Sequence, residues 1–110
     1  MAHDNFVYWT ETPPRQEVEQ IVENFFGGAA VFEKKESHWM ITLPGSPTHP
    51  LEYIVPSVED GLADERWIEV WFTGYDECID IATRHQDDFT KALAKRLAER
   101  IAAHYQAQLT

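Results

Sequence analysis

The sequence predicts a small α+β fold, in which an antiparallel sheet of about five or six strands is covered on one face by two amphipathic helices. Two segments have apolar residues at helical spacing, and the segments around them alternate apolar and polar residues as strands do. Several strands follow one another without a helix between them, which favours antiparallel pairing. The expected order is β-α-β-β-β-β-β-α, and the 110 residues are expected to form a single α+β domain, 1–110.

The first half of the chain supplies one helix and four strands of this scheme. The helix is expected at Arg15–Phe26, because its apolar residues recur every three or four positions and so form one stripe. Gly27 follows directly, where a glycine in the left-handed conformation can end a helix. The stripe consists of Val18, Ile21, Val22, Phe25 and Phe26. The strands are expected at Asn5–Thr10, Ala29–Lys34, Ser37–Leu43 and Leu51–Val55.

The second half contains the most regular patterns in the sequence. From residue 66 to residue 73, aliphatic or phenyl side chains alternate with a second set that includes tryptophan, glutamate and threonine. This alternation predicts a strand with an apolar core face. The core face holds Ile68, Val70 and Phe72, and the other face holds Trp67, Glu69 and Trp71. A turn at residues 74–76 and a second strand at residues 78–83 complete a hairpin. A terminal helix follows, whose apolar stripe is Phe89, Leu93, Leu97, Ile101, Tyr105 and Leu109.

The chain is strongly acidic, with a formal net charge of −10. Residues 1–86 contain 5 Lys or Arg and 16 Asp or Glu, a net −11, whereas residues 87–110 contain 4 and 3, a net +1. Such an excess repels nucleic acid and anionic membranes and speeds the encounter with a basic protein. We therefore expect a basic protein partner, with no direct binding of nucleic acid and no membrane association.

The sequence lacks the features of membrane-spanning and exported proteins. No run approaches the roughly 18 consecutive apolar residues of a membrane span. The first residues lack the basic and apolar regions of a signal peptide. The single cysteine, Cys78, cannot form an internal disulfide. The expected location is therefore cytoplasmic.

No combination of residues in the sequence predicts catalysis or cofactor binding. Cys78, Asp80 and His85 are near one another, but their spacing matches no usual zinc-ligand pattern. The acidic neighbours of Cys78 disfavour a nucleophilic thiolate. Glu69 and Asp80 can lie on neighbouring strands as an acid–base pair, although such pairs arise by chance among 19 acidic residues. We expect no enzymatic activity, no catalytic residue, no metal and no cofactor.

The aromatic residues Trp67, Trp71 and Tyr75 indicate the clearest candidate site. If the apolar face of their strand points to the core, both tryptophans point outward with Glu69 between them. Outward rings with carboxylates around them are typical of a protein interface, where aromatic anchors lie at the centre and charges at the rim. The predicted partner-binding residues are Glu65, Trp67, Glu69, Trp71, Tyr75, Asp76, Glu77 and Asp80.

In its size, acidity and lack of a catalytic constellation, the chain resembles the immunity proteins and inhibitors that neutralise toxins, often nucleases. This resemblance of general character implies a protein-binding module that blocks a basic partner by occlusion. One alternative is a homo-oligomeric structural or assembly accessory protein, of phage or secretion-system type, in which the tryptophan face pairs with itself in a homodimer. A second alternative is a small ligand-binding or enzymatic domain with a pocket between helices and sheet.

Overall fold

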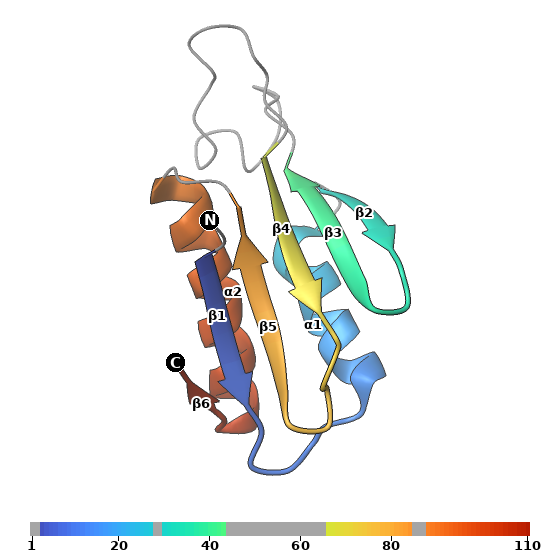
Figure 1. Ribbon diagram of the computed structural model, residues 1–110, viewed down its shortest axis with the longest axis vertical. Helices are drawn as coiled ribbons and strands as arrows, with labels where there is room; N and C mark the ends of the chain where they lie inside the picture. The colour runs from blue at the N-terminus through green and yellow to red at the C-terminus, as the bar shows by residue number, and fades with distance from the viewer. Residues whose placement is uncertain (1–2, 28–29, 44–65, 85–87) are drawn as a thin grey trace, which may run out of the picture.

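The computed structural model describes residues 3–27, 30–43, 66–84 and 88–110. Within these ranges the expected α+β fold is confirmed, with two helices and a six-stranded antiparallel sheet (Figure 1). The helices are α1 (Arg15–Phe26) and α2 (Asp88–Tyr105). The strands are β1 (His3–Tyr8), β2 (Val31–Lys34), β3 (His38–Leu43), β4 (Arg66–Trp71), β5 (Cys78–Thr83) and β6 (Gln108–Leu109). The strand expected at Leu51–Val55 lies outside the described residues.

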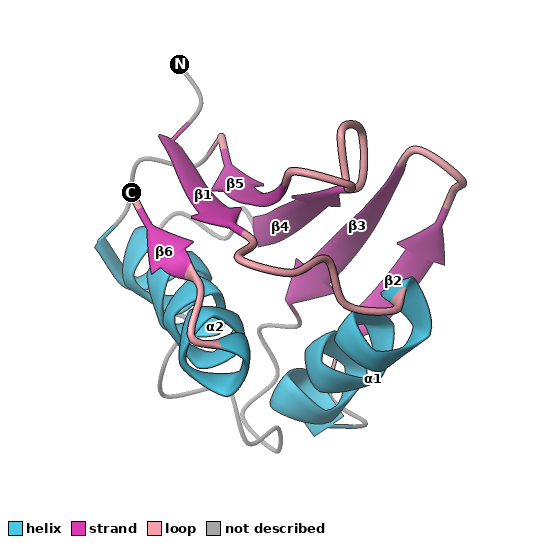
Figure 2. Ribbon diagram, turned by 90° about the horizontal axis from the view of Figure 1, so that it is seen from below, coloured by secondary structure: helices cyan, strands magenta, loops and turns pink. Residues whose placement is uncertain are grey.

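The strands are arranged in the order β2-β3-β4-β5-β1-β6, and the neighbouring strands pair in the antiparallel sense. Strand β1 is therefore inserted between β5 and β6, although it comes first in the chain. Both helices lie against the same face of the sheet, with α2 on the β1 side and α1 on the β2 side (Figure 2). Neither of the two described helices lies on the opposite face of the sheet.

The hydrophobic core lies between the sheet and the two helices. In β4 the side chains of Ile68 and Val70 are fully buried, as the alternation predicts. From the helices, the apolar stripes supply Val18, Val22 and Phe26 of α1, and Leu93, Leu97 and Ile101 of α2. Burying one such aliphatic side chain contributes about 1.5–3 kcal/mol. The helix-covered face is therefore the main source of stability.

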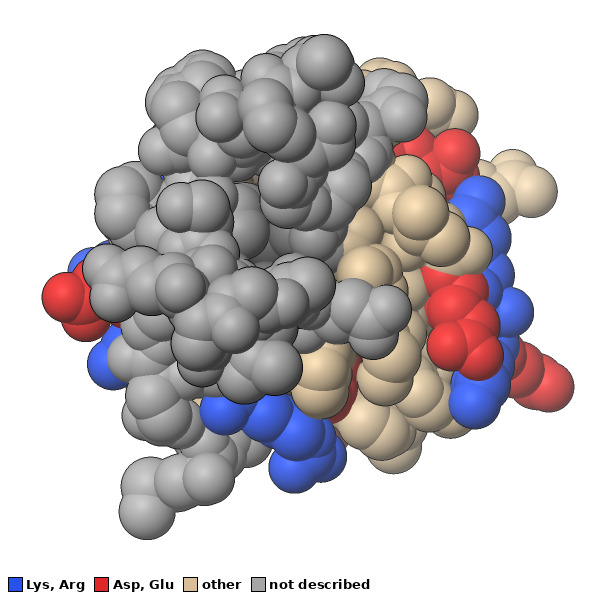
Figure 3. Space-filling view, turned by 90° about the horizontal axis from the view of Figure 1, so that it is seen from above, with Lys and Arg blue, Asp and Glu red and all other residues tan. Residues whose placement is uncertain are grey.

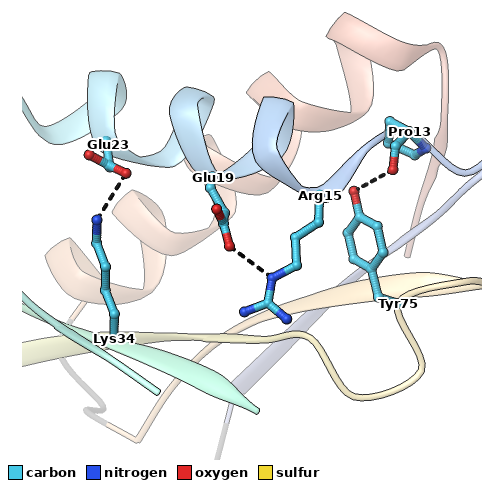
Figure 4. A network of polar contacts seen from close by, with 6 residues as sticks. All are labelled: Pro13, Arg15, Glu19, Glu23, Lys34 and Tyr75. Atoms are coloured by element: carbon cyan, nitrogen blue, oxygen red, sulfur yellow. Dashed lines mark hydrogen bonds and ion pairs between the residues drawn. The ribbon is translucent and has the colours of Figure 1, made fainter. Parts of the chain in front are cut away.

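Polar contacts lie within α1 and between the α1 region and the sheet (Figure 4). Two of them are ion pairs between partly exposed side chains, and such pairs contribute at most about 1 kcal/mol each. The third joins the β4–β5 turn to the segment that leads into α1. The contacts are Arg15 Nε to Glu19 Oε2 at 2.8 Å, Lys34 Nζ to Glu23 Oε2 at 3.0 Å, and the Tyr75 hydroxyl to the Pro13 carbonyl at 2.8 Å.

The end of α2 differs from the sequence-based expectation. The apolar spacing predicted a helix that includes Leu109, but α2 ends at Tyr105, and Gln106 adopts a φ of 52°. A positive φ reverses the chain direction at a helix end, so the following residues form β6 beside β1. Leu109 pairs with Val7 and packs against the core from this strand. The spacing thus identified an apolar position but assigned it to the wrong element.

Candidate functional site

The candidate site lies on the face of the sheet opposite the helices, which we call the helix-free face. Side chains alternate between the two faces along each strand, so the strand register determines which residues share this face. On the four inner strands they are Asp4, Phe6 and Tyr8 of β1, His38, Met40 and Thr42 of β3, Trp67, Glu69 and Trp71 of β4, and Cys78, Asp80 and Ala82 of β5. Most of these side chains are partly or fully exposed, whereas Glu69 and Ala82 are buried.

Glu69 is the centre of a hydrogen-bonded cluster on this face. The indole Nε1 of Trp67 donates to Glu69 Oε2 at 3.0 Å, and the indole Nε1 of Trp71 donates to Oε1 at 2.8 Å. Arg84 Nε also donates to Oε2, at 3.1 Å. Both carboxylate oxygens therefore have donors, and the two indoles are held on either side of Glu69. Residues two apart in a strand share a face, which explains why one carboxylate serves both tryptophans.

Glu69 keeps its negative charge despite being only 4% exposed. Burial alone would raise the pKa of Glu69, but the N–H donors of Trp71 and Trp67 and the charge of Arg84 together lower it below its ordinary value. The sequence suggested an aromatic centre with charge at the rim. Instead, a buried carboxylate is the centre and the tryptophans flank it, because their indole N–H groups need an acceptor on this face.

A second carboxyl group, that of Asp80, lies beside this cluster. In the register it is opposite Trp71 of β4 on one side and Phe6 of β1 on the other. Burial, a hydrogen bond with Asp4 and the negative charge of Asp4 raise the pKa of Asp80 to about 7. Its Oδ1 atom is buried and has no hydrogen-bond partner within the part of the chain that the structure describes. Asp80 is therefore partly protonated near neutral pH, unlike Glu69.

The imidazole of His38 extends the cluster across β3. It stacks on Trp71 with ring centroids 4.2 Å apart and an interplanar angle of 18°. The Oγ of Ser37 lies 3.0 Å from His38 Nδ1. The row His38, Trp71, Asp80 and Phe6 thus crosses four neighbouring strands on the helix-free face.

The structure brings together only part of the predicted partner-binding set. The predicted residues that share the helix-free face are Trp67, Glu69, Trp71 and Asp80. Asp76 and Glu77 are exposed in the turn between β4 and β5, at the end of these strands. Glu65 lies outside the described residues.

Tyr75 is separated from the two tryptophans with which the sequence grouped it. Its ring packs edge-on against Trp9, with centroids 5.4 Å apart, and its hydroxyl donates to the Pro13 carbonyl. It also packs against the core cluster. Burial raises the pKa of the Tyr75 hydroxyl. Tyr75 therefore anchors the β4–β5 turn to the helix side, because the turn changes the face to which alternation would have assigned it.

Sequence reasoning did not identify Arg84, Asp4 and His38 as members of the site. Alternation along β5 places position 84 on the same face as Asp80, which is a usable signal. The hydrogen bond of Arg84 to Glu69, however, can be inferred only from the register between β4 and β5. Asp4 and His38 likewise reach the cluster through pairings between strands that are distant in sequence, and those pairings leave no local pattern.

A separate surface cavity of about 290 Å³ lies where the segment leading into α1 meets the end of α2. The Tyr105 hydroxyl donates to Glu17 Oε1 at 3.1 Å in its wall. Burial and this bond with Glu17 raise the pKa of Tyr105 to about 12. The lining residues are Glu11, Thr12, Pro13, Pro14, Glu17 and Tyr105. The lining includes two carboxylates and the Tyr105 hydroxyl, but no residue of the sheet, whereas the ligand-binding alternative expected a pocket between helices and sheet.

Metal and thiol chemistry were also considered. Among the described residues, no three His, Cys, Asp or Glu side chains are close enough together to hold a metal ion. His85, part of the zinc pattern considered from the sequence, lies outside those residues. Burial and the charges of Glu77, Asp80 and Asp76 raise the pKa of the Cys78 thiol, which disfavours a reactive thiolate. Neither helix in the described ranges combines the length and the apolar character needed to cross a membrane.

No protein family model, curated protein or solved structure matches this chain. The class of protein is therefore defined by its architecture: an α+β protein with two helices on one face of a six-stranded antiparallel sheet. The helix-free face adds a buried carboxylate fixed between two tryptophans. Any function must be argued from that geometry and from the charge of the chain.

Proposed function

We propose that the chain is a protein-binding module that blocks a basic protein partner by covering it with the helix-free face. The observation that carries this proposal is the cluster in which Glu69 fixes the partly exposed indoles of Trp67 and Trp71. Rings that are already fixed lose little conformational entropy on binding, and tryptophan is enriched among the residues that dominate interface energies. The class envisaged is that of immunity proteins and inhibitors, with a toxin such as a nuclease as the basic target.

The distribution of charge supports a basic partner. Asp76 and Glu77 are exposed at the β4–β5 end of the helix-free face, and Asp4 is exposed beside Asp80. On the part of the opposite end that is drawn in colour, Figure 3 shows both acidic and basic side chains. Electrostatic steering by the exposed carboxylates of the helix-free face and the β4–β5 turn would favour the approach of a basic protein. The proposed module has no enzymatic activity and acts in the cytoplasm, where the lone Cys78 stays reduced.

Two alternatives are each favoured by one observation. The partly exposed tryptophans would also suit a homodimer that buries the helix-free face of two copies, as an assembly protein would. The cavity beside Glu17 and Tyr105 would suit a small cationic ligand.

The first experiment uses the purified chain and a Trp71→Ala variant as immobilised baits for an extract of the source cells. Proteins retained only by the wild-type bait are identified, purified and titrated against the soluble chain by calorimetry. We expect a basic protein that binds in a 1:1 ratio, at least tenfold more weakly to Trp71→Ala, and more weakly as salt rises. Lys95→Ala, an exposed change on α2, is the control and should bind as the wild type does.

Light scattering over a range of protein concentrations completes this test. A mass that rises with concentration in the wild type but not in Trp71→Ala would support the homodimer and contradict the basic-partner proposal. Identical retention by both baits would also contradict it. Trp71→Phe keeps an aromatic ring but removes the N–H donor. Comparing it with Trp71→Ala separates the loss of the ring contact with the partner from the loss of the hydrogen bond to Glu69. Circular dichroism verifies that each variant is folded.

A further inference from the structure

We infer that the basic partner binds the helix-free face through an amphipathic α-helix that lies along β5, with Phe6 and Tyr8 of β1 as further binding residues. This inference rests on the proposed function and specifies the element that the face recognises. It depends on the sizes of the side chains on neighbouring strands and on where the exposed carboxylates lie.

The side chains of β5 on this face are small, whereas both neighbouring strands present large rings. The β5 column consists of Cys78, Asp80 and Ala82. The register places Tyr8 opposite Cys78, and it places Phe6 and Trp71 on either side of the column. Because adjacent strands are about 4.8 Å apart, the two rows of rings are about 10 Å apart. A helix is about 10–12 Å across with its side chains, so its apolar ridge can lie over the β5 column while its sides contact the rings.

The other face of the same strands already binds a helix in this position. Helix α2 runs in the direction of β1 and β5 (Figure 1) and packs on β5, β1 and β4. The six residues of β5 span about 20 Å, which is the length of about 14 helical residues. A partner helix of about four turns can therefore cover these three strands from the helix-free side.

The exposure of Tyr8 supports a binding role for β1. Tyr8 and Val31 are the exposed large hydrophobic side chains among the described residues, at 43% and 67%. The Tyr8 ring lies beside that of Phe6, with centroids 6.2 Å apart. Val31 belongs to β2, whereas Tyr8 borders the β5 column. An exposed aromatic pair beside a row of small side chains is typical of a surface that receives the apolar stripe of a helix.

The charges around the β5 column determine the chemistry of the partner helix. Asp4 is exposed at the β1 border of the column, and Asp76 and Glu77 are exposed at its β4–β5 end. Arg84, a cation on this face, is bound to the Glu69 carboxylate. The complementary helix has aliphatic side chains in its stripe and Lys or Arg on its flanks. Its N-terminus, the positive end of the helix dipole, points toward the β4–β5 turn.

The test uses a blocked 14-residue peptide of Leu, Lys and Ala, with leucine at i, i+3, i+4 and i+7 spacing, in nuclear magnetic resonance titrations of the full chain. One comparison peptide has the same composition in an order without an apolar stripe, and another has Glu in place of Lys. The Trp71 indole N–H and the Tyr8 backbone N–H report on binding. We expect saturable shifts with the first peptide, at least fivefold weaker binding of the scrambled peptide, and no binding of the Glu peptide.

Two substitutions test the position of the helix in different ways. Tyr8→Ala removes a ring at the border of the column and should weaken binding at least fivefold. Cys78→Leu adds apolar surface but fills the column, and should also weaken binding at least fivefold, whereas an unspecific apolar surface would bind the peptide more tightly. Val31→Ala, an exposed apolar change on β2, is the matched control and should bind as the wild type does. Circular dichroism verifies folding, and either folded variant is sufficient for the test.

Equal binding of the first and the scrambled peptide would overturn the inference, and so would unchanged or tighter binding by Cys78→Leu. The result is separable from the function proposed above. A basic partner whose binding requires Trp71, but is unaffected by Tyr8→Ala and Cys78→Leu, leaves that function intact and removes the helix along β5. Peptide binding with the expected pattern, without any basic protein retained by the bait, does the reverse.

Discussion

The two faces of the sheet are built from the same strands but are stabilised in different ways. On the helix-covered face, Ile68 and Val70 are buried among other aliphatic groups, where any apolar side chain of similar volume would serve. On the helix-free face, Glu69 is equally inaccessible, yet it is stabilised by three specific donors. Burial of Glu69 on the helix-free face therefore depends on directed hydrogen bonds. A single substitution there should change hydrogen bonding and charge more than it changes packing.

The helix-free face itself contains two carboxyl groups with opposite behaviour. Glu69 has enough donors to remain ionised, and its pKa is lowered, whereas Asp80 faces Asp4 and its pKa is raised to about 7. They are diagonal neighbours on adjacent strands. The indole donors of Trp71 and Trp67, followed by Arg84, lower the pKa of Glu69, whereas burial and then Asp4 raise the pKa of Asp80. Three substitutions test these contrasts, in order of decreasing effect.

The largest effect should come from the helix-covered face. Leu97 is fully buried between α2 and the sheet. Leu97→Ala should lower the free energy of unfolding by about 2–5 kcal/mol, because it removes buried methyl groups and leaves a cavity. Urea denaturation followed by circular dichroism measures this change. A loss similar to that of an exposed alanine substitution on α2, such as Lys95→Ala, would show that the core does not lie where the structure places it.

A smaller loss is expected for Glu69→Gln, which keeps the shape of the side chain but removes its charge. The amide N–H₂ group would face donors that need an acceptor, so unfolding should become easier by about 1–3 kcal/mol. Because the pKa of Glu69 is lowered in the folded state, its contribution is complete above the ordinary value near 4.5 and is lost as the pH falls through the folded value. The difference between wild type and variant should therefore shrink at pH 3. A difference independent of pH would contradict the ionised cluster.

The smallest effect, and of opposite sign, is expected for Asp80→Asn. The pKa of Asp80 rises from an ordinary 3.8 to about 7 on folding, so the folded state holds a proton that the unfolded state releases. Stability from this group therefore decreases as the pH rises from about 4 to about 7. The variant removes that penalty. Because Asp80 is partly exposed, solvent screening reduces the expected gain over the wild type to about 1 kcal/mol at pH 8, with no gain at pH 4. The same difference between variant and wild type at both pH values would show that the Asp80 carboxyl ionises freely.

Local patterns predicted the two helices and strands β1 to β5 with their apolar faces, but not β6 or the polar cluster. The alternation in β4 correctly separated Ile68 and Val70 from Trp67 and Trp71, because a pleated strand has only two faces. The same reasoning could not determine that Glu69 is buried. One of its three donors, Arg84, reaches Glu69 through the pairing of β4 with β5, which the pattern of either strand alone does not reveal. Leu109 shows a second limit of sequence reasoning. Its position continues the apolar spacing of α2, but the chain reverses at Gln106 and the helix ends before Leu109.

The short strand β6 affects how the sheet could meet another sheet. Two residues, Gln108 and Leu109, pair with β1, and Thr110 exchanges backbone hydrogen bonds with Phe6 in both directions. This pairing occupies the outer side of β1, so among the described strands β2 presents the longer free edge. Edge-to-edge joining of two copies through β2 would leave the two-residue strand β6 at each outer edge. So short an edge offers few free backbone groups to a further copy, which disfavours continued growth of the sheet.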